Sequence, residues 1–166
     1  CIRDRFQIVQ GGQKLAGMLV FITDVHSMGL EIAQGLQFTT AFVWNQDEEA
    51  LEWSNRFYER HGAMPTMVQA GVYSAVSNYL QAVDAAGTDD GDAVRARLGE
   101  MELNDFFVKG GKIAPNGSML HDMYLVEVKS PDKSESEWDL LEVVSRIPAD
   151  QAYITMEDTK CSLVNQ

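Results

Sequence analysis

Five consecutive apolar residues, Met18-Leu19-Val20-Phe21-Ile22, decide the fold class of this 166-residue chain. A short, unbroken apolar run is typical of a strand that helices cover on both faces, as in a parallel sheet. Polar residues follow from Thr23 to Gly29, and we expect them to form a loop at the carboxyl end of that strand. The stretch therefore predicts an α/β protein.

The sequence around this stretch alternates between helical and extended patterns. Helices are expected over 2–10, 30–36, 45–61, 66–86 and 91–101, and strands over 18–22, 38–44, 119–129 and 138–147, with a hairpin turn at 115–118. Asn45 or Asp47 can cap the third of these helices. In the helix over 66–86 we expect one buried face, which consists of Val68, Val72, Ala75, Val76, Tyr79, Leu80 and Val83. These helices and strands are fewer than a doubly wound α/β domain requires.

The charge balance disfavours two classes of partner. Lys and Arg number 13 against 25 Asp and Glu, which gives a net charge of −12. Nucleic acid is not expected as a partner because phosphate contacts need a basic surface, and an anionic membrane surface is disfavoured for the same reason. The two cysteines, Cys1 and Cys161, are too few to staple a domain of this size, and no Cys/His spacing indicates a zinc site.

The tripeptide Asp24-Val25-His26 directly follows the predicted strand and is the first candidate site. Polar side chains at the carboxyl ends of strands are where α/β folds bind ligands. Asp24 or Ser27 could instead cap the next helix, and a carboxylate near an imidazole could belong to a catalytic triad. These three interpretations remain open on sequence grounds.

Tyr73 is the second candidate. It lies near the beginning of the helix predicted over 66–86, where an aromatic ring beside a cleft can cover an apolar ligand. The alternative is that Tyr73 is one more core or boundary aromatic residue.

Several stretches, in this order and spacing, carry a family resemblance. They are KLAGMLVFITDVHSMG (14–29), AQGL (33–36), PTMVQAGVYSAV (65–76), HDMYL (121–125), EVKSP (127–131), WD (138–139) and CSLV (161–164). With them, the chain resembles the carboxyl-terminal portion of a branched-chain amino acid type substrate-binding protein of an ABC importer. The resemblance covers nearly the whole sequence.

The resemblance implies a partial type I periplasmic binding fold, with pieces of two three-layer α/β/α lobes plus a β-hairpin. It places residues 1–44 in the second lobe, 45–129 in the first lobe, and 130–166 in a hinge crossover and the return to the second lobe. Such proteins are about twice as long, so we expect a mature or truncated piece whose signal peptide is removed. Apolar faces would then be exposed, and a homodimer of the piece is one way to cover them.

The resemblance also implies a function. It indicates a periplasmic protein that closes on a small amino acid, aromatic acid or amide and then docks on an ABC permease, with no catalytic residue, cofactor or metal. It implies Asp24 as a ligand contact, with Val25 and His26 beside it, and Tyr73 as a cleft aromatic from the other lobe. Two other classes are a ligand-sensing module of a regulator or receptor on the same fold, and a hydrolase that uses Asp24 and His26.

Overall fold

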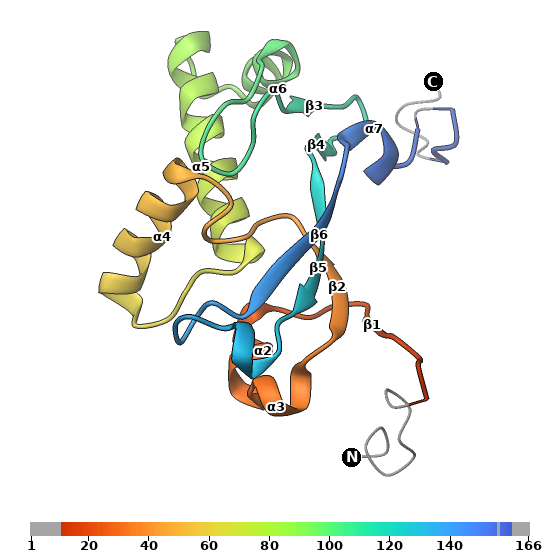
Figure 1. Ribbon diagram of the computed structural model, residues 1–166. Helices are drawn as coiled ribbons and strands as arrows, with labels where there is room; N and C mark the ends of the chain where they lie inside the picture. Colours follow the sequence, from red (N-terminus) through yellow and green to blue (C-terminus); the bar gives the residue numbers. More distant parts are fainter. Residues whose placement is uncertain (1–10, 156, 161–166) are drawn as a thin grey trace.

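The computed structural model describes residues 11–155 and 157–160, and within them a mixed sheet lies beside a group of helices (Figure 1). The helix predicted over 2–10, Cys1 and Cys161 lie outside the described residues. The architecture is α/β, as the sequence predicts.

The sheet has the strand order β1-β2-β5-β6. Strand β1 (Leu15–Gly17) is parallel to β2 (Leu36–Thr40), whereas β5 (Met123–Val128) is antiparallel to both β2 and β6 (Leu141–Ile147). The ladder between β5 and β6 shifts register between Leu125 and Val126, so that Val126 pairs with Val143 and Leu125 with Ser145. Helices α2 (Ile22–Met28) and α3 (Leu30–Ala33) connect β1 to β2.

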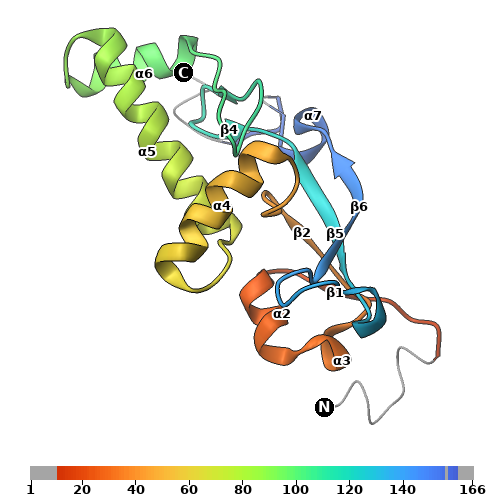
Figure 2. The same cartoon turned by 60° about the vertical axis from the view of Figure 1, so that its left-hand side comes forward.

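Three longer helices form the other part of the described chain: α4 (Glu48–His61), α5 (Met67–Ala86) and α6 (Gly91–Glu100). They lie together to one side of the sheet in both views (Figures 1 and 2). The hairpin of β3 (Lys112–Ile113) and β4 (Met119–Leu120) follows them, and the predicted turn at 115–118 is confirmed. A 3₁₀ turn, η1 (Pro131–Lys133), precedes β6, and the short helix α7 (Ala149–Ala152) follows it.

Two hydrophobic cores match these two parts. The sheet core contains Ile22, Val25, Ala33, Phe38, Val43, Met64, Val126, Val128, Trp138 and Leu140. The helical core contains Ala41, Phe42, Ala50, Trp53, Ala70, Leu103, Phe106, Phe107 and Val108. Trp44 packs against both. The segment just after β2 therefore joins the two cores.

The strand predicted over 18–22 is wrong. Strand β1 ends at Gly17, and Met18 and Leu19 are 95% and 71% exposed. The chain turns sharply after Gly17, where a Cβ would lie 2.4 Å from Val20 Cγ2. The turn brings Ile22 into the sheet core as the first residue of α2. An apolar run shows that residues can be buried, but not that they share one strand.

The polar loop predicted over 23–29 is also wrong, because Ile22–Met28 is helical. Ile22 and Val25, three residues apart, are its buried side, and Gly29 ends it with a φ of 78°. The strand expected over 38–44 occupies 36–40, and the strands expected over 119–129 and 138–147 are observed as β4 with β5 and as β6.

The predicted burial of α5 is wrong in its direction, although the helix itself is confirmed. Its buried residues are Ala70, Ser74, Asn78 and Ala82. The larger apolar residues are exposed instead: Val68, Val72, Tyr73, Val76, Tyr79 and Leu80. Periodicity identifies the apolar stripe, but the described chain covers the opposite side.

Candidate functional site

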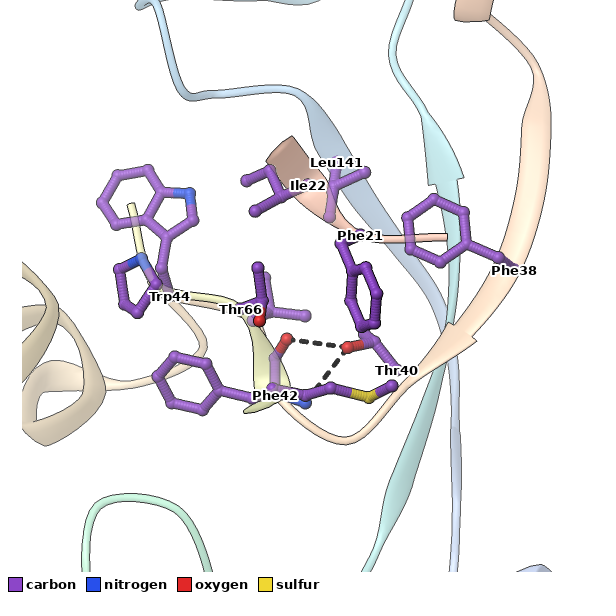
Figure 3. A pocket seen from close by; sticks show the side chains of 11 residues that line it. Phe21, Ile22, Phe38, Thr40, Phe42, Trp44, Thr66 and Leu141 are labelled. Atoms are coloured by element: carbon purple, nitrogen blue, oxygen red, sulfur yellow. Dashed lines mark hydrogen bonds between the residues drawn. The ribbon is translucent and has the colours of Figure 1, made fainter. Parts of the chain in front are cut away.

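A pocket lies where the sheet meets the helical part of the molecule (Figure 3). Its volume is about 10 Å³, which is close to the space that one water molecule needs. The beginnings of two helices reach it, with Phe21 and Ile22 at α2 and Thr66 and Met67 at α5, together with the segment from Thr40 to Trp44 that leaves β2. The pocket thus lies at the boundary of the two cores.

Local hydrogen bonds fix the walls of this junction pocket. Thr40 Oγ1 donates to the carbonyl oxygen of Phe42 at 3.1 Å, which holds the turn at the end of β2. Thr66 Oγ1 accepts from the N–H of Val68 at 3.1 Å, and Gln69 Oε1 accepts from the N–H of Thr66 at 3.0 Å. This capping box satisfies N–H groups that the first turn of a helix cannot pair internally.

Asp24 and Val25 have structural roles on α2. Asp24 Oδ2 accepts a hydrogen bond from the N–H of Phe21 at 2.8 Å, and the carboxylate itself is exposed. Its charge also suits the positive end of the helix dipole. Val25 is fully buried in the sheet core. Asp24 therefore caps the helix that contains it, and not the following helix α3, as the capping interpretation expects.

His26 lies on the exposed side of α2 and joins the helix to a distant segment. Its ring stacks on Trp138 with centroids 4.1 Å apart and planes 5° apart. Its Nε2 donates to Glu137 Oε1 at 2.9 Å. Asp24 and His26 are two residues apart on a helix, so their side chains diverge, and each has a different partner. The Asp–His pair that the hydrolase hypothesis requires is not formed.

Trp138 connects three elements around the sheet core. It stacks on His26 of α2, precedes β6, and its carbonyl oxygen accepts from Trp44 Nε1 at 3.1 Å. Its own Nε1 is buried without a hydrogen-bond partner. Sequence analysis lists Trp138 in the resemblance but does not predict its contact with His26, because the two residues are far apart in the chain and no local pattern indicates a contact of that range.

Tyr73 lies on α5 in an aromatic group of the helical part. Its ring meets those of Trp53 and Phe106 edge to face, at 5.5 and 5.4 Å. It also lines an open groove of about 540 Å³ between α4 and α5, together with Trp53, Phe57, Val68, Val72 and Val76. Tyr73 contacts rings of the helical part, whereas His26 contacts Trp138 of the sheet part. The structure therefore places Tyr73 in the helical part and the tripeptide at 24–26 in the sheet part.

A largely buried ion pair lies beside Trp138. Lys129 Nζ donates to Asp139 Oδ1 at 2.6 Å, and Asp139 Oδ2 accepts from the N–H of Glu135 at 3.1 Å. Burial alone would raise the pKa of Asp139, but the hydrogen bond from Lys129, the Glu135 N–H and the Lys129 charge outweigh it. The pKa of Asp139 is therefore lower than its ordinary value of 3.8. The pair fixes the segment that positions Trp138.

Replacing this aspartate, Asp139→Asn, is expected to destabilise the protein by about 1 to 2 kcal/mol at pH 7, because the charged acceptor is lost. A lowered folded-state pKa contributes stability above the unfolded-state pKa, and that stability is lost as the pH falls through the folded-state pKa. Urea denaturation at pH 7 and below pH 3 measures this. The difference between the native chain and the variant should shrink as the pH falls through the folded-state pKa of Asp139. An equal difference at both pH values would contradict the assignment.

The described residues hold no group of three or more His, Cys, Asp or Glu side chains arranged to bind a metal ion. Within the same residues, no helix combines the length and the apolar character needed to cross a membrane.

Comparison with known proteins gives the family. The family model described as periplasmic binding protein matches residues 4–135. A solved periplasmic binding protein from Burkholderia mallei is 45% identical with a TM-score of 0.90, and the match covers 97% of this chain and 42% of that one. A branched-chain amino acid ABC transporter periplasmic ligand-binding protein from Burkholderia xenovorans is 37% identical with a TM-score of 0.89, covering 96% and 44%. No curated protein matches.

The chain belongs to the periplasmic binding protein family and has a partial form of its fold. It spans about two fifths of the length of the solved relatives. The fold extends to distant sequences. A solute-binding protein from Rhodopseudomonas palustris, solved with 3,4-dihydroxybenzoic acid, is 17% identical with a TM-score of 0.73, and the match covers 89% of this chain and 40% of that one.

Proposed function

We propose that this chain is part of the extracytoplasmic solute-binding component of an ABC importer, which binds a small amino acid or a related organic ligand between two lobes. The observation that carries the proposal is the junction of two separate cores at residues 41–44, within a chain of this family. Two cores joined by a short segment are the arrangement that hinge closure requires. The periplasm is the compartment that the family implies.

The lobes are proposed as follows. Residues 1–44 form part of the second lobe, 45–129 part of the first, and 130–166 the hinge crossover and the return to the second lobe. Buried residues of 22–38 belong to the sheet core and most of those of 50–108 to the helical core, which supports the division. Met64, Val126 and Val128 also belong to the sheet core and depart from it. Strand β5 pairs with β2 and β6, so residues 123–128 join the sheet of the second lobe although the proposed boundary assigns them to the first.

Ligand binding is proposed to draw on both lobes. Asp24 and His26 are exposed on α2, and Asp24 would meet a cationic amino group, while Val25 beneath them anchors the helix in the core. Tyr73 would offer an aromatic face from the other lobe. A ligand that touches both lobes only in the closed form shifts the hinge equilibrium toward closure. The closed form would then be recognised by a membrane permease.

The test uses a full-length periplasmic binding protein that contains this chain. Thermal-shift and calorimetric titrations would cover leucine, valine, 3,4-dihydroxybenzoate and acetamide. A true ligand stabilises the folded protein by mass action and so raises its melting temperature. At a ligand concentration of a hundred times the Kd, the free energy of unfolding increases by about 2.7 kcal/mol. If none of the four compounds binds, the proposed ligand classes are wrong.

The role of Asp24 is tested by two matched variants. Asp24→Asn keeps an oxygen that can accept from the Phe21 N–H but removes the charge, so we expect at least a tenfold loss of affinity for an amino acid with little change in stability. Asp24→Ala also removes the capping hydrogen bond and should lower the free energy of unfolding by about 1 kcal/mol more. Equal ligand affinity in Asp24→Asn and the native protein would exclude Asp24 as the contact to the amino group.

A further inference from the structure

A pocket of about 310 Å³ beside α4 and α5 combines basic with aromatic side chains. Its basic residues are Arg56, Arg60 and His61, and its aromatic residues are Trp53, Phe57 and Tyr73. This arginine pocket shares its three aromatic rings with the groove of about 540 Å³ between the same two helices. A pocket that offers both positive charge and apolar surface is suited to a small organic ligand.

Helix α4 supplies most of this pocket from one of its sides. Positions 53, 56, 57, 60 and 61 follow one another at separations of three or four residues, at which the side chains of a helix become neighbours. Phe57 stacks on Trp53 with ring centroids 5.6 Å apart, and it meets the ring of His61 at 5.1 Å. Tyr73 of α5 joins them through its contact with Trp53 at 5.5 Å. The rings therefore form a connected wall beside the two guanidinium groups.

Neither arginine is needed to hold the described chain together. That part of the chain contains eleven Lys and Arg residues, and six of them form an ion pair with a carboxylate. Arg56 and Arg60 have no ion-pair or hydrogen-bond partner for their side chains among the described residues, although Glu52 lies four positions before Arg56 on the same helix. In a chain with a net charge of −12, two adjacent cations without a carboxylate partner are available to an outside anion.

The helix dipole explains only part of this arrangement. Arg60 and His61 lie in the last turn of α4, where a cation is favourable, but Arg56 lies one turn earlier, beyond the reach of that effect. A guanidinium group offers parallel N–H donors to the two oxygens of a carboxylate. An inorganic anion would leave the three rings uncovered, and a neutral ring would leave the two charges unpaired. A carboxylic acid with an aromatic body fits both features.

We propose that the arginine pocket is the first-lobe side of the ligand cleft and binds an aromatic carboxylic acid, whose carboxylate is held by Arg56 and Arg60. Tyr73 then contacts the ring of the ligand and retains the role that the proposed function gives it. In both views the carboxyl-terminal end of α4 is the end nearer to α2 (Figures 1 and 2), on which Asp24 and His26 are exposed. The proposal rests on the proposed function and narrows its ligands to one class.

The experiment uses a full-length periplasmic binding protein that contains this chain, and three probes that separate the charge from the ring. Benzoate has both, benzamide has the ring without the charge, and acetate has the charge without the ring. Calorimetric titration at pH 7 is expected to show that benzoate binds roughly tenfold more tightly than either of the other two, because only benzoate uses both the guanidinium groups and the rings.

Two variants assign the charge to its residues. Arg56→Gln and Arg60→Gln should each weaken benzoate binding by roughly tenfold and change benzamide binding less than twofold. A merely structural role of the arginines would affect both probes alike. The matched control is Arg95→Gln, at an exposed arginine of α6 that does not line the pocket, and it should change benzoate binding less than twofold. Circular dichroism checks that α4 is intact in each variant.

The other outcomes overturn the proposal. Benzoate binding that neither variant weakens would show that the acid is bound elsewhere, and equal binding of benzoate and benzamide would show that the charge is not recognised. Acetate that binds as tightly as benzoate would show a site for anions without selection for a ring. Binding of leucine or acetamide without benzoate would refute the aromatic acid and leave the proposed function standing. If none of these compounds binds, both proposals fail together.

Discussion

Replacing Trp138 with alanine is expected to lower the free energy of unfolding by about 3 to 5 kcal/mol, the usual cost of deleting a buried aromatic side chain. The indole is buried in the sheet core and carries the stack with His26. Alanine keeps the main-chain carbonyl that accepts from Trp44, so the loss comes from packing alone. Urea denaturation followed by circular dichroism measures the effect.

Two variants control this experiment. Trp138→Phe should cost no more than about 1.5 kcal/mol, because an aromatic ring remains and the removed N–H has no partner to lose. His26→Ala removes the stacking partner from the exposed side and should cost about 0.5 to 1.5 kcal/mol. If Trp138→Phe were as damaging as Trp138→Ala, the stability would depend on the indole N–H or on the full size of the indole ring and not on aromatic packing alone.

Replacing Asp105 with alanine is expected to destabilise the protein by about 3 to 4 kcal/mol, because it leaves buried donors without an acceptor. Asp105 Oδ2 accepts from Ser74 Oγ at 2.6 Å and from Asn78 Nδ2 at 3.0 Å. Its Oδ1 accepts from the N–H groups of Phe107 and Val108. One carboxylate therefore holds the turn that carries the aromatic residues of the helical core against α5.

The same network allows a double-mutant test. Ser74 and Asn78 are buried, so Ser74→Ala and Asp105→Ala remove the same contact from opposite sides, and their combined cost should be less than the sum of the two. Asp89→Ala, at an exposed aspartate before α6, is the control and should cost no more than about 0.5 kcal/mol. Strict additivity of the first two variants would show that the network does not act as a unit.

The sequence predicts the helical part well because helix signals are local. Asp47 caps α4 and Gly62 and Gly87 end α4 and α5, as their residue types indicate. The side of α5 that is covered could not be predicted, because the pattern identifies an apolar stripe without saying which part of a protein lies against it. The strand predicted at 18–22 fails for a similar reason, since the turn after Gly17 depends on close contact with Val20.

The candidate site is less accessible to sequence reasoning. The tripeptide at 24–26 lies within helix α2 rather than in a loop, and its ligand role stays a prediction. The stack between His26 and Trp138 joins residues more than a hundred positions apart. Only packing brings such residues together, so neither spacing nor composition could have identified Trp138 or the junction pocket.

The register shift in the ladder between β5 and β6 has a consequence for the direction of side chains. Val143 pairs with Val126 and Ser145 with Leu125, so Val144 is the extra residue. Before Val144, the odd-numbered side chains of β6 lie on the same side of the sheet as Val126, and after Val144 the even-numbered ones do. Arg146 therefore lies opposite Tyr124, where it forms an ion pair with Asp122. Without the bulge, the register of Val126 with Val143 would continue and pair Arg146 with Met123, which would send that guanidinium to the other side of the sheet.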